Sequence, residues 1–295
     1  MSRIVSFLPA ATEITFAIGA GVDLVGRSHE CDYPDQVKHL PVVSKPALPI
    51  ADMSQEEIDR AVASHLASGE SLYQVDEILL NQLSPDIVLT QDLCQVCAPS
   101  GNELSRALSE LRERPQVLWL TPRTLDEIRE NILDIGRATG RTSGADGVVA
   151  EFLARIAAVR DAVRGVIARR VIFLEWTEPP FCAGHWVPEM IAIAGGADPL
   201  AQTGTDSLRA TWEAVAAASP EIVVVAPCGY GLKQAKVAAA NIPRLAGARV
   251  FAVDANAYFA RPGPRVSEGV ELLAHLFHPE RVAWTHAHRP WAEVA

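Results

Sequence analysis

The sequence predicts an α/β protein with two Rossmann-like lobes, each built on a mainly parallel sheet and joined by a long backbone helix. Two observations carry this prediction. Short apolar runs alternate with amphipathic segments in residues 1–122 and again in 170–295, which is typical of βαβ units. Between them, residues 123–169 show only helical spacing. We therefore expect an N-terminal α/β lobe at 1–122, a backbone helix at 123–169 and a C-terminal α/β lobe at 170–295.

In the N-terminal lobe, strands and helices are expected to alternate. Each predicted strand is a short run rich in Val, Ile and Leu, and each predicted helix has apolar residues three or four positions apart. The expected strands are 3–8, 23–28, 86–91 and 116–121, and the expected helices are 11–20, 75–84 and 102–113.

The middle segment is expected to form one helix over 124–168, kinked or interrupted near Gly140 and Gly144. Thr124 and Glu127 have the spacing of a capping box at its start. One apolar face follows, made of Leu125, Ile128, Ile132 and Ile135.

In the C-terminal lobe the alternation resumes. The expected strands are 170–176, 221–227 and 249–255, and the expected helices are 188–195, 211–219, 232–240 and 264–277. Ligands of open parallel sheets bind where the strands end, so the segments that follow these strands are where a site is expected.

Composition excludes some classes of function. A net charge of −10 argues against nucleic acid as a partner, because phosphate binding needs a basic surface. No apolar window is long enough to span a membrane. The chain starts directly in a predicted strand without the apolar stretch of a secretory signal, so the sequence as given predicts a cytoplasmic protein with reduced thiols.

All five cysteines follow predicted strands. Four residues from two N-terminal loops, His29, Cys31, Cys94 and Cys97, would form a Cys3His site suited to zinc or another thiophilic metal. A redox pair at Cys94 and Cys97, or partly buried thiols without a ligand, are the alternatives.

Aromatic residues gather in the segment 176–186. Trp176, Phe181 and Trp186 would form a platform for a large flat ligand, or would pack a hinge between the lobes. Tyr230 also follows a predicted strand and is a further candidate ligand contact. Four histidines near the carboxyl end, His275, His278, His286 and His288, are interpreted as solvated tail residues. No motif supplies a catalytic acid–base pair, so no enzymatic activity is expected.

Three stretches carry a resemblance to a known family. They are "RIVSFLPAATEITFAIGAGVDLVGRSHECDYP", "TLDEIRENILDIGRATGR" and "RPGPRVSEGVELLAHLFHPE". They resemble the substrate-binding proteins of cobalamin and iron-chelate ABC importers, and cobalamin-binding members above all. The resemblance implies a non-enzymatic binding protein with a ligand between the lobes, a small-molecule cargo and an importer permease as partner.

The resemblance also implies roles for particular residues. Tyr33 and the 91–97 loop, with Gln91 and Asp92, would line one side of the ligand, and Trp176, Trp186 and Tyr258 the other. Glu77 and Glu213 would dock the permease, one from each lobe. The expected function is therefore binding of cobalamin or a related corrinoid or metal chelate, and the alternative is an intracellular zinc-binding protein. A binding protein of an importer would be periplasmic or at the cell surface, with its native start trimmed here.

Overall fold

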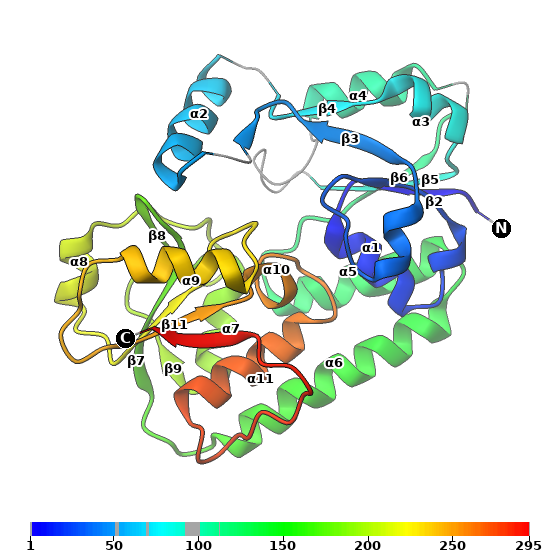
Figure 1. The fold of residues 1–295 in the computed structure, drawn as a ribbon. Coiled ribbons are helices and arrows are strands. Elements are labelled where there is room, and N and C mark those ends of the chain that lie inside the picture. Colours follow the sequence, from blue (N-terminus) through cyan, green and yellow to red (C-terminus); the bar gives the residue numbers. More distant parts are fainter. Residues whose placement is uncertain (1, 51–52, 69–70, 92–100, 112, 295) are drawn as a thin grey trace. The chain divides into compact units, whose positions relative to one another are not determined.

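The computed structural model describes residues 2–50, 53–68, 71–91, 101–111 and 113–294. The chain forms two compact units, each of them discontinuous in sequence (Figure 1). Unit 1 contains residues 1–122 and 127–150, and unit 2 contains residues 123–126 and 151–295. Each unit is an α/β structure with a six-stranded sheet at its centre and helices packed on it. The sequence predicts this class of fold for both units.

Unit 1 has a sheet in the order β4-β3-β2-β1-β5-β6. All neighbouring strands are parallel except β4, which pairs antiparallel with β3. The chain moves outward through β2 and β3 and then returns to β5 beside β1, so the topological switch lies between β1 and β5. The strands are β1 (Ile4–Ser6), β2 (Leu24–Ser28), β3 (Val42–Pro46), β4 (Tyr73–Val75), β5 (Ile87–Thr90) and β6 (Gln116–Trp119).

Helices cover both faces of this sheet, with α1 and α5 on one side and α3 and α4 on the other (Figure 1). On the second side, Val5 and Val88 of the sheet pack against Leu80 of α3 and Leu104 of α4. The helices are α1 (Pro9–Ala17), α2 (Gln55–Ala67), α3 (Glu77–Leu83), α4 (Gly101–Ser109) and α5 (Leu125–Ala138), with short 3-10 turns η1 (Gly21–Asp23) and η2 (Asp35–His39).

The predicted backbone helix is two helices, α5 and α6 (Thr142–Ala162). Gly140, at φ +67°, ends the first in the left-handed region that glycine favours. The apolar face of α5 is buried as its spacing predicts. Two glycines permit close approach around α6. A Cβ at Gly136 would overlap Ala145, and one at Gly144 would overlap the carbonyl oxygen of Ile18. Helix α6 belongs to unit 1 up to Ala150 and to unit 2 from Glu151.

Unit 2 has a sheet in the order β12-β11-β10-β7-β8, with β9 paired to the start of β7. Strands β7, β10 and β11 are parallel, as predicted. Strands β8 and β12 are antiparallel additions that the sequence did not predict. The strands are β7 (Arg169–Thr177), β8 (Pro180–Cys182), β9 (Gly196–Ala197), β10 (Ile222–Val225), β11 (Arg249–Val253) and β12 (Trp291–Val294).

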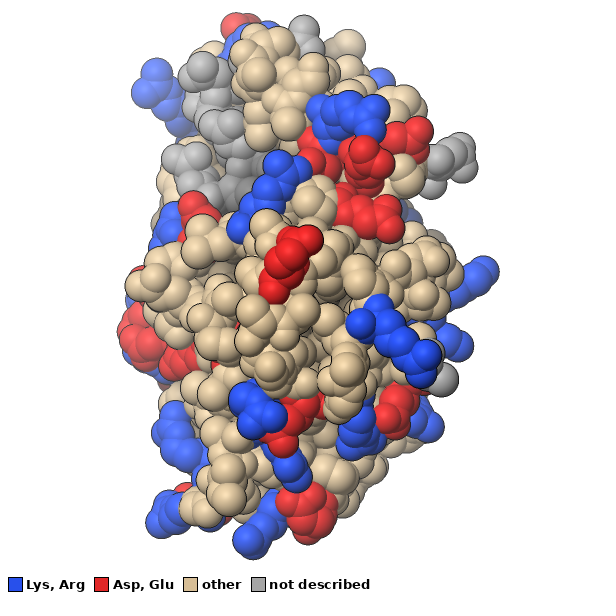
Figure 2. Space-filling view, turned by 90° about the vertical axis from the view of Figure 1, so that its left-hand side faces the viewer, with Lys and Arg blue, Asp and Glu red and all other residues tan. Residues whose placement is uncertain are grey.

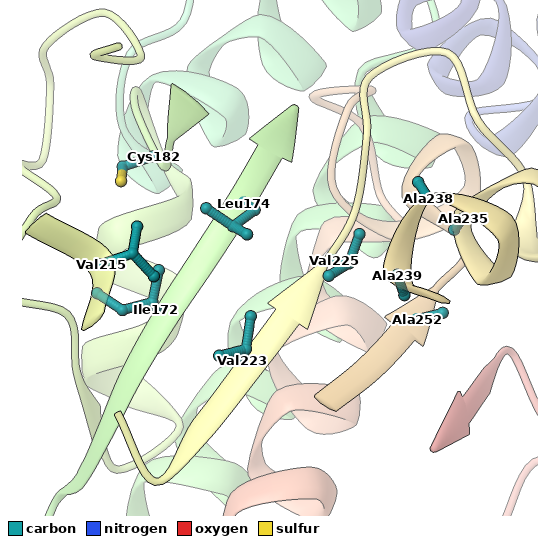
Figure 3. Packing of buried hydrophobic residues seen from close by; sticks show 10 residues of the cluster. All are labelled: Ile172, Leu174, Cys182, Val215, Val223, Val225, Ala235, Ala238, Ala239 and Ala252. Atoms are coloured by element: carbon teal, nitrogen blue, oxygen red, sulfur yellow. The ribbon is translucent and has the colours of Figure 1, made fainter. Parts of the chain in front are cut away.

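The core of unit 2 forms because its central strands are apolar on both faces, which a covered parallel sheet requires. On one face, Ile172 and Leu174 of β7 and Val223 and Val225 of β10 form one cluster, which Val215 of α8 covers beside Ile172 and small alanines of α9 cover beside Val225 (Figure 3). The opposite face packs Phe173 edge-on against Phe259, with ring centroids 5.2 Å apart. The helices of the unit are α7 (Val187–Ile193), α8 (Trp212–Ala217), α9 (Leu232–Asn241), α10 (Ala255–Tyr258) and α11 (Val266–Phe277).

On the face seen in Figure 2, lysine and arginine side chains lie singly among acidic and uncharged ones and form no continuous basic patch. Within the described ranges, no helix is both long and apolar enough to cross a membrane.

Candidate functional site

The parallel strands of unit 2 end at one edge of the sheet, which we call the carboxyl edge. Two aromatic residues meet there. Trp176 lies near the end of β7, and Tyr230 follows β10. Their ring centroids are 5.6 Å apart with a 57° angle between the planes, and both rings are partly exposed. The pair is therefore a partly exposed aromatic surface at this edge, and ligand contact by Trp176 and Tyr230 stays a prediction.

Backbone hydrogen bonds fix this pair in place. The amide of Cys228 donates to the Glu175 carbonyl at 3.0 Å, which ties the segment after β10 to β7. Asn256 of α10 holds the same segment from the other side. Its side chain donates to the Gly229 carbonyl at 3.0 Å, and its amide donates to the Tyr230 carbonyl at 3.3 Å. These hydrogen bonds link the end of β7 with the segments that follow the neighbouring strands β10 and β11.

Phe181 lies on β8, within the hairpin that follows β7. The sequence did not predict this strand, in which Pro180–Cys182 pairs antiparallel with the end of β7. The guanidinium carbon of Arg209 lies 5.8 Å from the centroid of the half-buried Phe181 ring. Phe181 as a ligand contact stays a prediction.

Trp186 and Tyr258, two other predicted contacts, lie inside unit 2. Trp186 is only 6% exposed and donates from Nε1 to the Phe259 carbonyl at 3.0 Å. Tyr258 is 2% exposed, and its hydroxyl lies 2.6 Å from Nε2 of His288. Neither ring presents a free face in this structure, so we expect both to support the carboxyl edge from beneath. Their direct contact with a ligand stays a prediction.

A polar network packs beside the hairpin. The Glu175 carboxylate accepts hydrogen bonds from the Gly184 amide at 3.0 Å and from the Ser207 hydroxyl. His185 adopts a left-handed φ of +53°, and its Nε2 lies 3.3 Å from the Asp206 carboxylate. Burial lowers the pKa of His185, and Asp206 opposes that shift. Arg123, just before α5, is 2.9 Å from the same carboxylate. Sequence reasoning missed this network, because nothing local in the sequence relates residue 123 to residue 206.

Two further groups near β7 have raised pKa values. Burial raises the pKa of the Asp198 carboxyl to about 6, although the Phe173 and Leu200 amides each donate to it at 2.9 Å. Burial, helped by Asp198 and Glu175, raises the pKa of the Cys182 thiol to about 12. Cys182 therefore stays protonated. It is a packing residue of the unit 2 core and not part of an open crevice (Figure 3).

Three predicted ligand contacts belong to unit 1: Tyr33, Gln91 and Asp92. Gln91 follows β5 at the topological switch, where open parallel sheets bind ligands. Its side chain is 5% exposed, and within the described part of the chain its amide nitrogen has no hydrogen-bond partner. Tyr33 is 47% exposed. Asp92 lies outside the described residues.

The predicted zinc site is only half described. Cys94 and Cys97 lie outside the described residues. Cys31 is fully buried and accepts a hydrogen bond from the Thr12 hydroxyl at 3.1 Å. The two ring nitrogens of His29 lie 3.4 Å from the Ser44 hydroxyl and 3.3 Å from Glu30. Among the residues that the structure describes, no group of three or more His, Cys, Asp or Glu side chains is arranged to hold a metal ion.

The two predicted docking glutamates both begin helices. Glu77 opens α3 after the N-cap Asp76, and it pairs with Arg106 at 3.1 Å. Glu213 lies in the first turn of α8 and is exposed. Hydrogen bonds from its own amide and from Thr211 lower its pKa. Docking itself stays a prediction for both.

The carboxyl-terminal histidines are not a solvated tail, and that interpretation was wrong. His278 is buried, and its Nε2 lies 3.0 Å from the Gly195 carbonyl. His275 packs against Trp291, with ring centroids 4.9 Å apart. His286 lies 3.1 Å from Glu271. The Trp and His pattern of residues 284–291 was the signal that could have indicated an ordered segment.

A family model for periplasmic binding proteins matches residues 4–249 of the chain. The chain therefore belongs to the periplasmic binding protein family, in the group of substrate-binding proteins that serve ABC importers. This confirms the family that the three sequence stretches indicated, and it confirms the two-lobed α/β fold.

Individual proteins similar to this chain bind tetrapyrrole-type ligands or serve ABC transporters, according to their names. The chain is 25% identical over 276 residues to the vitamin B12-binding protein of Vibrio cholerae, covering 92% of this chain and 87% of the relative. It is 25% identical to YvrC, an ABC transporter substrate-binding lipoprotein of Bacillus subtilis, covering 94% and 80%. Among solved structures, the periplasmic heme-binding protein RhuT of Roseiflexus sp. is 26% identical with a TM-score of 0.69, covering 94% and 98%.

Proposed function

We propose that this protein binds a corrinoid, such as cobalamin, or a closely related metal chelate, and delivers it to the permease of an ABC importer. The single observation that carries the proposal is the likeness to vitamin B12-binding proteins over 92% of the chain. A heme-binding structure of similar fold and identity makes heme the second candidate cargo.

The carboxyl edge of unit 2 supports this proposal physically. A large planar macrocycle gains most of its binding free energy from burial against apolar and aromatic surface. The Trp176–Tyr230 pair supplies such a surface. Hydrogen bonds from Asn256 to the segment after β10, and from the Cys228 amide to the Glu175 carbonyl, hold the pair rigid before binding. A preformed surface loses little conformational entropy when a ligand arrives. The placement of the ligand between the two lobes stays a prediction.

The proposal includes the partner. Glu213 is exposed and ionised at the start of a helix, where a carboxylate is available to an arginine of another protein. Glu77 is partly engaged by Arg106, so we expect it to contribute less to docking. The relative named as a lipoprotein supports a site of action at the outer side of the cytoplasmic membrane.

Binding is tested by titrating the purified full chain with cyanocobalamin, diaquacobinamide and hemin. Tryptophan fluorescence and heat of binding are the two readouts. We expect saturable binding of at least one macrocycle, and Trp176→Ala should weaken it about tenfold, which corresponds to roughly 1.4 kcal/mol of lost stacking and burial. Trp176→Phe is the matched control, because it keeps an aromatic ring at the same position. No saturable signal with any of the three compounds would refute the proposal.

A further inference from the structure

The carboxyl edge of unit 2 also presents an imidazole that is held in one orientation. His288 is exposed. Its Nε2 lies 2.6 Å from the Tyr258 hydroxyl, and the two rings are stacked with an interplanar angle of 21°. Trp284 donates from Nε1 to the His288 carbonyl at 2.7 Å. Both the ring and the backbone of His288 are therefore held by hydrogen bonds.

The antiparallel pairing of β12 with β11 brings His288 to this edge. Trp291 lies opposite Val253, the last residue of β11, and the Asp254 amide donates to the Pro290 carbonyl at 2.9 Å. The residues just before β12 therefore lie beside the start of α10. Because the strand order is β12-β11-β10-β7, the segments next to these strands follow one another along the edge, and each carries one ring-bearing residue. In order they are His288, Tyr258, Tyr230 and Trp176.

The hydrogen bond to Tyr258 is compatible with either neutral tautomer of the imidazole, because a hydroxyl can both donate and accept. In the tautomer with the proton on Nε2, the ring donates to the Tyr258 oxygen and leaves a lone pair on Nδ1. Metal-ligating histidines are oriented in this manner, with the other ring nitrogen donating to an oxygen acceptor. Imidazole nitrogen is a common axial ligand of iron in heme. In that tautomer, His288 has the hydrogen-bond arrangement of a metal-ligating histidine.

We propose that His288 coordinates the central metal of the bound chelate through Nδ1, with Tyr258 as a positioning residue whose hydroxyl oxygen accepts a hydrogen bond from the Nε2–H group. This inference rests on the proposed function. The step is a ligand exchange: a water leaves the axial position of the metal, and a nitrogen–metal bond forms from the Nδ1 lone pair. No electron is transferred, and the Nε2 proton stays on the imidazole. The cargo is then a chelate with an exchangeable axial position, such as diaquacobinamide or hemin.

The experiment compares binding and visible absorption in the full-length wild type and in variants. His288→Asn is the main variant, because an amide can still hydrogen-bond to Tyr258 but is a poor axial ligand. His286→Ala is the matched control, because that neighbouring imidazole is engaged by Glu271 at 3.1 Å. Protoporphyrin IX without metal is the matched ligand control. Tyr258→Phe tests the positioning role.

The wild type should shift the visible spectra of hemin and diaquacobinamide from water to nitrogen ligation, and His286→Ala should do the same. His288→Asn should retain the unshifted spectrum and bind hemin about tenfold more weakly, with unchanged affinity for metal-free protoporphyrin. Tyr258→Phe should give a weaker or heterogeneous shift.

The outcomes separate the two proposals. If the wild type binds a macrocycle but its spectrum is the same in His288→Asn, the ligand assignment is overturned and the proposed function stands. If the wild type binds no macrocycle, the proposed function fails, and the assignment fails with it. A His288→Asn protein whose affinity for metal-free protoporphyrin falls equally has lost the surface and not a metal bond, which also overturns the assignment.

Discussion

The Glu189 carboxylate on α7 accepts a hydrogen bond from the Leu125 amide, the first residue of α5, at 3.0 Å. An early amide of α5 is thus satisfied by a side chain 64 residues away. The amides of a helix's first turn have no partner within the helix, and a carboxylate there also interacts favourably with the helix dipole.

Glu189→Ala should therefore destabilise the protein by about 1 kcal/mol, the usual cost of removing a side-chain cap. Glu189→Gln keeps an acceptor oxygen and should lose about half as much. Midpoints of chemical unfolding, followed by circular dichroism, measure both. Equal losses in the two variants would show that charge, and not the hydrogen bond, is what matters.

Alanine substitutions at two glycines of α6 should change the stability of the protein in opposite directions. A Cβ at Gly144 would overlap the backbone carbonyl of Ile18, whereas a Cβ at Gly147 would meet nothing within 4 Å. Gly144→Ala should destabilise by about 2 kcal/mol, because backbone must move to admit the methyl group. Gly147→Ala should stabilise by about 0.5–1 kcal/mol through helix propensity.

Thermal unfolding of the two alanine variants side by side tests this pair. The sign of the difference is the result to examine, since both substitutions are chemically identical and lie in the same helix. A stabilised Gly144→Ala would mean that α1 and α6 do not approach as closely as the structure shows.

Asp198 predicts a pH dependence of stability. Its pKa is raised from 3.8 to about 6 in the folded protein, so the native state keeps a proton that the unfolded state loses. The contribution is fully present below about pH 4 and is lost as pH rises to about 6, with a slope of up to roughly 1.4 kcal/mol per pH unit.

The measurement is the free energy of unfolding between about pH 4 and 7 in the wild type and in Asp198→Asn. The asparagine cannot titrate, yet its oxygen can still accept from the Phe173 or Leu200 amide. Subtracting the two curves should leave the Asp198 slope alone. Parallel curves would contradict the raised pKa.

The thiols should differ in reactivity. Cys228 is exposed after β10, whereas Cys31 and Cys182 are buried, and the pKa of Cys182 is raised to about 12. Because the thiolate is the reactive species, iodoacetamide should modify Cys228 in the native protein. Cys31 and Cys182 should react only in concentrated guanidinium. Peptide mapping by mass spectrometry reports each residue separately, and rapid native labelling of Cys182 would contradict its place in the core.

The sequence predicted most of the parallel strands, because each is a short apolar run whose neighbours are helices. It did not predict the parallel strand β3, nor the short strands β4 and β9. It missed β8 and β12 because their evidence is not local. Pro180 resembles a loop residue, and β12 follows a polar segment with Pro290. Both become strands only because an edge of the β7–β11 sheet is available for pairing.

For the candidate site, the sequence predicted which residues lie at the strand ends but not the directions of their side chains. The position of Trp176 and Tyr230 follows from where strands end, and the structure brings them together. The direction of a side chain does not follow from its place in the sequence. Trp186 turns inward to donate to the Phe259 carbonyl. The contact of Tyr258 with His288 depends on the unpredicted β12 pairing, so no local pattern could have indicated it.

The way α5 and α6 are shared between the units has a consequence for synthesis on the ribosome. The chain passes from one unit to the other after residues 122, 126 and 150. A nascent chain that ends at Pro122 lacks Ile128, Ile132 and Ile135, which are fully buried in the finished protein. The sheet of unit 1 can therefore be covered on this face only after α5 and the start of α6 have emerged from the ribosome. A gene fragment cut at the apparent end of the first lobe should give an aggregating product, and one that continues through residue 150 is the shortest that includes every part of unit 1.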